Sequence, residues 1–333
     1  MTASEVATRD AGGKSQTLMI SASKLRRTFR ARGGTVEAVA GVDLRVEAGE
    51  IFGFLGPNGA GKTTTLRLLA TLLPPTAGEA TVAGCDLLRQ PARVRERIGY
   101  VGQRGGADPV VTGRRELVFQ ARLYGATATA AQQRAAELLS LFQLEEVADR
   151  PYGSYSGGQR RRLDIALGLV HRPKLLFLDE PTSGLDPQGR ANLWDEVRAL
   201  RADGVTVFLT THYLEEADAL CDRLAIIDHG KIVSEGTPDQ LKRQISGDLV
   251  TIGVAERQEA ALQLLSGQPF VREASAADDV IRLYVDRGET AMPAILRLLD
   301  GAGLELRTIA LSRPSLDDVF LRKTGRSLRE RAA

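Results

Sequence analysis

The chain contains the sequence Gly56-Pro57-Asn58-Gly59-Ala60-Gly61-Lys62-Thr63, which fits G-x-x-x-x-G-K-[ST] without a gap. A short apolar run, 51–55, precedes it, and residues 62–73 follow with leucines at helical spacing. Glycines let a backbone wrap closely around phosphate oxygens, and a helix N-terminus adds positive potential. We predict that Lys62 reaches the β- and γ-phosphates and that the Thr63 hydroxyl binds Mg²⁺. The stretch predicts a nucleotide site, but it does not choose among GTPases, kinases, helicases and transport ATPases.

A second strand ends in two carboxylates. Four apolar residues, 175–178, are followed by Asp179 and Glu180. A buried strand that ends in Asp179 can place that side chain beside a metal at the carboxyl edge of the sheet. Glu180 would then orient or deprotonate an attacking water near the γ-phosphate. The alternative is a strand followed by an acidic turn.

A third motif, Tyr155-Ser156-Gly157-Gly158-Gln159, stands where a helix is expected to begin. Residues 163, 166, 167 and 170 give that helix one apolar face. Ser156 suits the N-cap, and the two glycines leave backbone amides uncovered. This is a second anion-binding surface. One nucleotide needs only one such cradle, so the second implies contact with another surface of the bound nucleotide.

Together these motifs resemble the ATP-binding subunit of an ABC transporter, whose consensus signature LSGGQ has Tyr155 in place of leucine here. The resemblance covers about residues 20–240. It implies that Gln103 reaches Mg²⁺ and senses a membrane partner, that Asp186 lies in a loop touching the opposite subunit, and that His212 is the switch histidine. Glu180, His212 and Lys62 are the implied catalytic residues, and Thr63, Gln103 and Asp179 the implied metal ligands. The residues implied to contact ATP are Phe29, Val39, Gly56, Pro57, Asn58, Gly59, Ala60, Gly61, Lys62, Thr63, Thr64, Gln103, Ser156, Gly157, Gly158, Gln159 and Asp186.

Three further stretches, 156–166, 211–218 and 314–321, resemble the daunorubicin- and doxorubicin-resistance type of export ATPase. This implies an exporter of a drug-like or lipid-like substrate through a separate transmembrane permease subunit. Sugar-importer ATPases carry an all-β extension, whereas residues 248–311 predict the order βαββαβ. The alternatives are an importer ATPase and a soluble ABC ATPase that drives no transport. A single cassette and the lack of a long coiled coil argue against the non-transport class.

The length, 333 residues, suits two domains. We expect a disordered tail over 1–17, a nucleotide-binding domain over 18–244 and an accessory domain over 245–333. The first is an α/β core with a mixed sheet and a helical subdomain, as strands alternating with helices indicate. The second reads as a small α+β, ferredoxin-like domain.

Composition limits the classes of partner. No apolar run approaches the roughly 18 residues that span a bilayer. A net charge of +2 gives no strong footprint for nucleic acid. The cluster 160–162 reads as a solvated helix face. Since the chain has one cassette, the resemblance implies a homodimer with ATP and Mg²⁺ bound between the chains. It also implies a peripheral position on the cytoplasmic side of the membrane.

Overall fold

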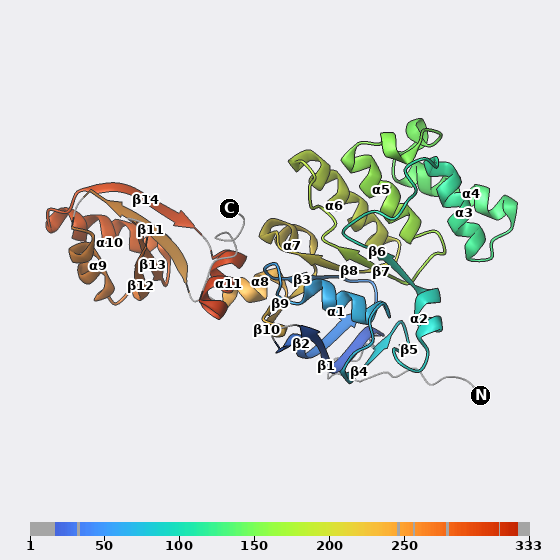
Figure 1. The fold of residues 1–333 in the computed structure, drawn as a ribbon. Helices are drawn as coiled ribbons and strands as arrows, with labels where there is room; N and C mark the ends of the chain where they lie inside the picture. Colours follow the sequence, from blue (N-terminus) through green and yellow to red (C-terminus); the bar gives the residue numbers. More distant parts are fainter. Residues whose placement is uncertain are drawn as a thin grey trace. The chain divides into compact units, whose positions relative to one another are not determined.

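The computed structural model describes residues 17–31, 34–244, 247–255, 257–277, 280–312 and 314–325. The predicted tail therefore lies outside the described residues, apart from Thr17. The chain divides into two compact units, Met1–Thr237 and Pro238–Ala333. This division falls earlier than the expected 244/245 boundary, because helix α8 (Pro238–Arg243) goes with the second unit. Figure 1 shows the helices and strands of both units with their labels.

The first unit is built on a six-stranded sheet in the order β10-β9-β3-β8-β7-β6. Its strands are β3 (Ile51–Leu55), β6 (Ile98–Val101), β7 (Leu175–Asp179), β8 (Thr206–Thr211), β9 (Arg223–Asp228) and β10 (Lys231–Gly236). All neighbours pair in parallel except β9 and β10. Every residue of β3, β7 and β8 is buried, as expected for parallel strands covered on both faces. Parallel pairing brings the loops after these three strands to one edge.

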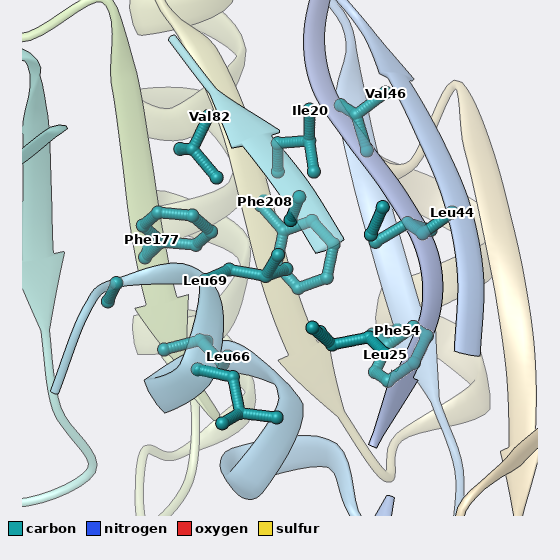
Figure 2. Packing of buried hydrophobic residues seen from close by; sticks show 14 of the residues in the cluster. Ile20, Leu25, Leu44, Val46, Phe54, Leu66, Leu69, Val82, Phe177 and Phe208 are labelled. Carbon is teal, nitrogen blue, oxygen red and sulfur yellow. The ribbon is translucent and has the colours of Figure 1, made fainter. Parts of the chain in front are cut away.

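An antiparallel sheet in the order β2-β1-β4-β5 completes the sheet core of this unit. Its strands are β1 (Leu18–Ala31), β2 (Gly34–Glu47), β4 (Ala77–Val82) and β5 (Cys85–Asp86). Side chains from both sheets meet in one apolar cluster, in which Phe208 and Phe177 face Ile20 and Val82 (Figure 2). The Phe208 ring lies 5.7 Å from that of Phe52 and 5.6 Å from that of Phe177, centroid to centroid. This packing fixes the strands whose ends form the site.

Helices complete the first unit. They are α1 (Lys62–Leu69), α2 (Pro91–Arg97), α3 (Gly113–Leu123), α4 (Ala128–Leu141), α5 (Gly157–Gly168), α6 (Pro187–Ala202) and α7 (Leu214–Leu220), with short 3₁₀ turns at Glu145–Val147 and Tyr152–Ser154. The expected helix 62–73 ends earlier, at Leu69, because Thr71 adopts a left-handed φ of 61°. Helices α3 and α4 are separated at Gly125, which has a left-handed φ of 85°. No helix among the described residues is long and apolar enough to span a bilayer.

The second unit confirms the predicted βαββαβ order. Its strands are β11 (Asp248–Val254), β12 (Val271–Ala277), β13 (Val280–Val285) and β14 (Leu306–Ser312), and its helices α8, α9 (Gln258–Ser266), α10 (Gly288–Gly301) and α11 (Leu316–Thr324). The strand order β12-β13-β11-β14, antiparallel throughout, is that of a ferredoxin-like sheet. Helix α11 starts with a capping box between Ser315 and Asp318.

The aromatic cluster around Phe208 generates a stability prediction. Phe208 is fully buried, so Phe208→Ala should lower the free energy of unfolding by about 3–5 kcal/mol. Val36→Ala, at a side chain 56% exposed on β2, is the control and should change it by less than about 0.5 kcal/mol. Urea unfolding followed by Trp194, the chain's single tryptophan, reports on this unit. An unchanged midpoint for Phe208→Ala would contradict the packing described.

Candidate active site

The loop between β3 and α1 forms a tight cradle. Gly61 has a φ of 104°, and a Cβ placed on it would lie 2.3 Å from the Ala38 carbonyl oxygen. A Cβ on Gly56 would lie 2.3 Å from the Ile227 carbonyl oxygen. Only glycine fits at these two positions without moving backbone. The Lys62 ammonium folds back over the loop and donates to the carbonyls of Gly56 at 2.7 Å and Pro57 at 3.2 Å.

A polar cavity of about 500 Å³ opens over this loop. Its lining residues are Ala38, Pro57, Asn58, Gly59, Gly61, Lys62, Thr63, Thr64, Gln103 and Glu180. Most of the loop residues predicted to bind nucleotide therefore share one cavity with Gln103 and Glu180. Gly56 and Ala60 are buried beneath it.

Asp179 is fully buried at the end of β7. Its Oδ1 accepts from the Thr63 hydroxyl at 3.0 Å and from the Thr210 hydroxyl at 2.6 Å. Its Oδ2 has no hydrogen-bond partner among the described residues. A buried carboxylate oxygen without a partner, next to a threonine hydroxyl, is a donor set that suits Mg²⁺. Gln103, the third predicted ligand, contacts Glu180 instead of these two residues.

Glu180 is the centre of a charged cluster. Its Oε2 accepts from Gln103 Nε2 at 2.8 Å, and its Oε1 lies 3.3 Å from Lys62 Nζ. His212 Nδ1 also lies 3.3 Å from Oε1, although its angles do not make a well-formed hydrogen bond. Burial alone would raise the pKa of Glu180, but contact with His212 and the charge of Lys62 lower it to about 2. The predicted catalytic residues Lys62, Glu180 and His212 are thus brought together.

The loops after β7 and β8 hold these groups in place. Glu180 has a left-handed φ of 46°, which is strained for a residue with a Cβ. Its amide donates to the Thr210 carbonyl at 3.1 Å and to the Thr210 hydroxyl at 3.0 Å. The His212 ring lies 4.1 Å from the Tyr213 ring, and the Arg190 guanidinium covers Tyr213 at 4.2 Å. Because Arg190 belongs to helix α6, this stack connects His212, the predicted switch histidine, to that helix.

The signature residues lie at the start of α5, outside this cavity. Ser156 caps the helix in a reciprocal capping box with Gln159. Gly157 and Gly158 face open space, since a Cβ on either would meet nothing within 4 Å. Tyr155 is buried and donates to the Val147 carbonyl at 2.7 Å. The tyrosine therefore fills an interior position and finds a polar partner there.

Besides Gly56, Ala60 and the signature residues, three more residues predicted to contact ATP do not line the cavity: Phe29, Val39 and Asp186. Val39 is fully buried in the core, and its neighbour Ala38 lines the cavity instead. Phe29 is half-buried on β1, under the guanidinium of Arg27 at 4.8 Å. Asp186 is exposed and caps α6 by accepting from the Gly189 amide at 2.8 Å. No sequence motif indicated that Ala38 lines the cavity, because its position there depends on the packing of β2 against the glycine loop.

The expectation that the arginine cluster forms a solvated helix face is wrong for two of its residues. Arg160 is exposed, but Arg162 is only 20% exposed and pairs with Glu196 at 2.9 Å. Arg161 is buried and donates to three main-chain carbonyls at the site. Apolar periodicity could not reveal this, because an arginine on a helix normally marks its solvent face.

Both units are similar to known proteins of the ABC transporter family. A family model described as ABC transporter matches residues 39–183, and one described as ATP-binding protein DrrA1-3-like, C-terminal domain, matches residues 236–324. The chain is 47% identical to the daunorubicin resistance ATP-binding protein DrrA2 of Streptomyces coeruleorubidus, over 88% of this chain and 92% of that protein. It is 41% identical to the Nod factor export ATP-binding protein I of Burkholderia pseudomallei, over 87% of this chain and 93% of that protein.

A solved structure is also similar. An ATP-binding cassette that is dimeric, in a post-hydrolysis state and bound to ADP and Pi, has a TM-score of 0.61 and 25% identity. The match covers 66% of this chain and 98% of the cassette.

The low pKa of Glu180 predicts a loss of stability in acid. Because the folded pKa, about 2, lies below the ordinary 4.5, the contribution of the carboxylate is present above pH 4.5 and lost as the pH falls toward 2. Between about pH 5 and pH 2, the wild type should therefore lose on the order of 2–3 kcal/mol more than Glu180→Gln. Urea midpoints at each pH measure this. Glu215→Gln, at an exposed glutamate on α7, should follow the wild-type curve. Parallel curves for wild type and Glu180→Gln would contradict the cluster.

Proposed function

This chain belongs to the ATP-binding subunits of ABC transporters. On that premise we propose that it binds and hydrolyses ATP to energise export of a drug-like or lipid-like substrate through a separate membrane subunit. The observation that carries the proposal is the convergence of Lys62, Gln103 and Glu180 on one polar cavity over the glycine loop. Importer and non-transport ATPases are not favoured, since the relatives above are named for drug resistance and export.

The residues of the cavity suit phosphate and water. Loop amides and Lys62 would hold the β- and γ-phosphates, as in other glycine-loop nucleotide sites. Thr63 and Asp179 would hold Mg²⁺, which neutralises phosphate charge when bound. Glu180 would orient the attacking water, and His212 would stabilise charge that develops on the γ-phosphate.

Nucleotide binding should also change Glu180. In the structure Lys62 lies 3.3 Å from the Glu180 carboxylate and donates to the carbonyls of Gly56 and Pro57. A γ-phosphate would compete for the same ammonium. Losing part of this ion pair raises the pKa of Glu180, so the carboxylate becomes a stronger base when ATP is present.

A complete site would need two chains. The uncovered amides at Gly157 and Gly158 do not line the cavity of their own chain. In a two-fold dimer each of these helix starts can face the nucleotide on the partner, and the interface then occurs twice. A dimeric cassette bound to ADP and Pi is among the similar structures, which supports this arrangement. Asp186, exposed at the cap of α6, would lie at the same interface.

A membrane subunit would dock on the segment from the loop after Gln103 to Tyr124. Four large apolar side chains of this segment are exposed: Val110 (79%), Phe119 (54%), Leu123 (63%) and Tyr124 (52%). Phe119 and Leu123 lie one turn apart on α3, opposite its buried Leu117 and Ala121. Exposed apolar clusters mark interaction sites. This position also suits Gln103 as the sensor of the partner and a peripheral place on the cytoplasmic side of the membrane.

The second unit would act outside the nucleotide chemistry. None of its described residues lines the cavity. The apolar face of α11, made by Leu316, Val319 and Phe320, is already buried, and α11 packs against α8 within this unit. We assign the unit an accessory role in dimer stability or in coupling, without a contribution to ATP binding.

ATP should drive dimerisation of a hydrolysis-deficient variant. Glu180→Gln keeps the shape of the side chain but removes its charge, so ATP should bind and not turn over. ATP at about 100 times its dissociation constant stabilises the bound state by about 2.7 kcal/mol. Sedimentation should show a dimer with Mg-ATP and mainly monomer without it. Adding Ser156→Arg in the same background should abolish the dimer, because the arginine would crowd the partner's γ-phosphate. A double variant that still dimerises would exclude a composite site.

Docking on α3 is tested separately. Phe119→Asp places a charge on the exposed apolar cluster and should weaken co-purification with the membrane subunit by about ten-fold or more. Basal ATPase activity of the isolated chain should stay within about two-fold of wild type, since Phe119 is exposed and does not line the cavity. Leu88→Asp, at a leucine 57% exposed after β5, is the matched control and should leave co-purification unchanged. Equal capture of both variants would refute this docking site.

A further inference from the structure

Arg161 is a buried cation without a carboxylate partner. Its side chain is 8% exposed, and among the described residues no carboxylate oxygen lies within ion-pair distance of it. Its Nη1 donates to the carbonyl of Gly102 at 2.7 Å, its Nε to that of Pro181 at 2.8 Å and its Nη2 to that of Asp179 at 3.0 Å. The carboxylates of Asp164, Asp179 and Glu216 attract this charge from beyond ion-pair distance. Burying a charge without a direct ion pair is costly, so the hydrogen bonds to the three carbonyls must hold the guanidinium in place.

The three carbonyls surround the catalytic groups. The Asp179 carbonyl belongs to the peptide that enters Glu180, and the Pro181 carbonyl lies directly after Glu180. The Gly102 carbonyl belongs to the peptide that enters Gln103, whose amide donates to Glu180 Oε2 at 2.8 Å. The Arg161 guanidinium therefore donates hydrogen bonds to the backbone on both sides of Glu180 and to the carbonyl that directly precedes Gln103.

The hydrogen bonds from Arg161 help to hold the unusual backbone conformation of Glu180. Glu180 has a φ of 46°, a conformation that persists only where surrounding contacts hold it. On one side the amide of Glu180 bonds to Thr210 of β8. Arg161 supplies the contacts on the other side, from helix α5. A guanidinium is rigid and presents its donors as a fork, so it can hold several carbonyls in one fixed arrangement.

We propose that Arg161 is a positioning residue, which fixes Glu180 and Gln103 of its own chain relative to the signature helix α5. This inference rests on the proposed ATPase function of the site. Helix α5 begins after Ser156, the residue expected to meet the partner's nucleotide. Arg161, just over one turn into the same helix, thus connects the surface that contacts the partner's ATP to the residue that acts on this chain's own ATP.

Steady-state kinetics on the full chain test the proposal. Arg161→Gln should lower kcat for ATP by about 100-fold, because a small displacement of a catalytic group has an effect of that size. The KM for ATP should stay within about two-fold, because the glycine loop and Lys62 are untouched. Arg161→Lys keeps the buried charge but loses the fork, so it should not restore kcat. Arg162→Gln, at the next residue of α5, is the matched control: it breaks the ion pair with Glu196 of α6 and should lower the melting temperature while kcat per folded chain is kept.

Mixed dimers provide a second measurement. In a dimer with one Lys62→Ala chain, only the other chain holds a working glycine loop. Arg161→Gln should lower turnover by about 100-fold when it is on the chain with intact Lys62 and have little effect when it is on the Lys62→Ala chain. Equal loss from both placements would show an interface role and overturn the proposal.

Three further results of the kinetic experiments would overturn the positioning role of Arg161. Wild-type kcat in Arg161→Gln, or recovery in Arg161→Lys, would show that Arg161 does not position Glu180. A fall in kcat that only tracks loss of folded protein, equally in the Arg161 and Arg162 variants, would show a structural role and overturn it too. If Arg161→Gln does not fold, Arg161→Lys decides. A wild-type chain without ATPase activity would instead overturn the proposed function, which is a distinguishable failure.

Discussion

Parallel pairing of β3 with β8 and of β8 with β7 is the constraint on which the site depends. It sets Leu55 opposite Thr211 and Asp179 opposite Thr210, so three strands end side by side. The glycine loop, the two carboxylates and His212 each follow one of these ends. The core of phenylalanine rings beneath, centred on Phe208, holds the strands at this spacing. A change of register in any of them would move a catalytic group by a whole residue, about 3.3 Å.

The two carboxylates at this edge, Asp179 and Glu180, have different kinds of partner. Asp179 is satisfied on one oxygen by two threonine hydroxyls and leaves the other without a partner. Glu180 instead gathers Lys62, Gln103 and His212 around its carboxylate. Neighbouring residues on one strand end are thereby given different chemistry, since one keeps an open acceptor for a cation and the other is held as an ion pair. Burial makes both arrangements costly to change without a ligand.

The sequence predicted those parts of the fold and site that are encoded by contiguous motifs, and it missed those that depend on contacts between distant residues. The glycine loop and the two acids at the end of β7 are contiguous motifs, and each follows a strand in which every residue is buried. The sequence therefore predicted both strands and the position of the two motifs at one edge of the sheet. The end of α1 depends on a left-handed Thr71, and the boundary before α8 depends on packing; neither has a strong local pattern. Ala38 and Arg161 were missed for the same reason. Their positions depend on elements distant in sequence, and for Arg161 the residue type pointed to solvent.

The position of α5 would allow nucleotide chemistry in one chain to depend on a second chain, as the proposed function requires. The N-terminal end of this helix exposes two glycines and a capped serine, while its first buried side chain, Arg161, donates to carbonyls around Glu180. Ser156 and Arg161 lie just over one turn apart at the start of this helix, so they are expected to move together. Under the proposed arrangement, a contact made with Ser156 from outside would therefore act on Glu180 inside. Because a γ-phosphate would also draw Lys62 from Glu180, occupancy of the site changes the basicity of this carboxylate and contact with the partner changes its position. Under the proposed function, hydrolysis would require both, so the catalytic unit would be the dimer and not the single chain.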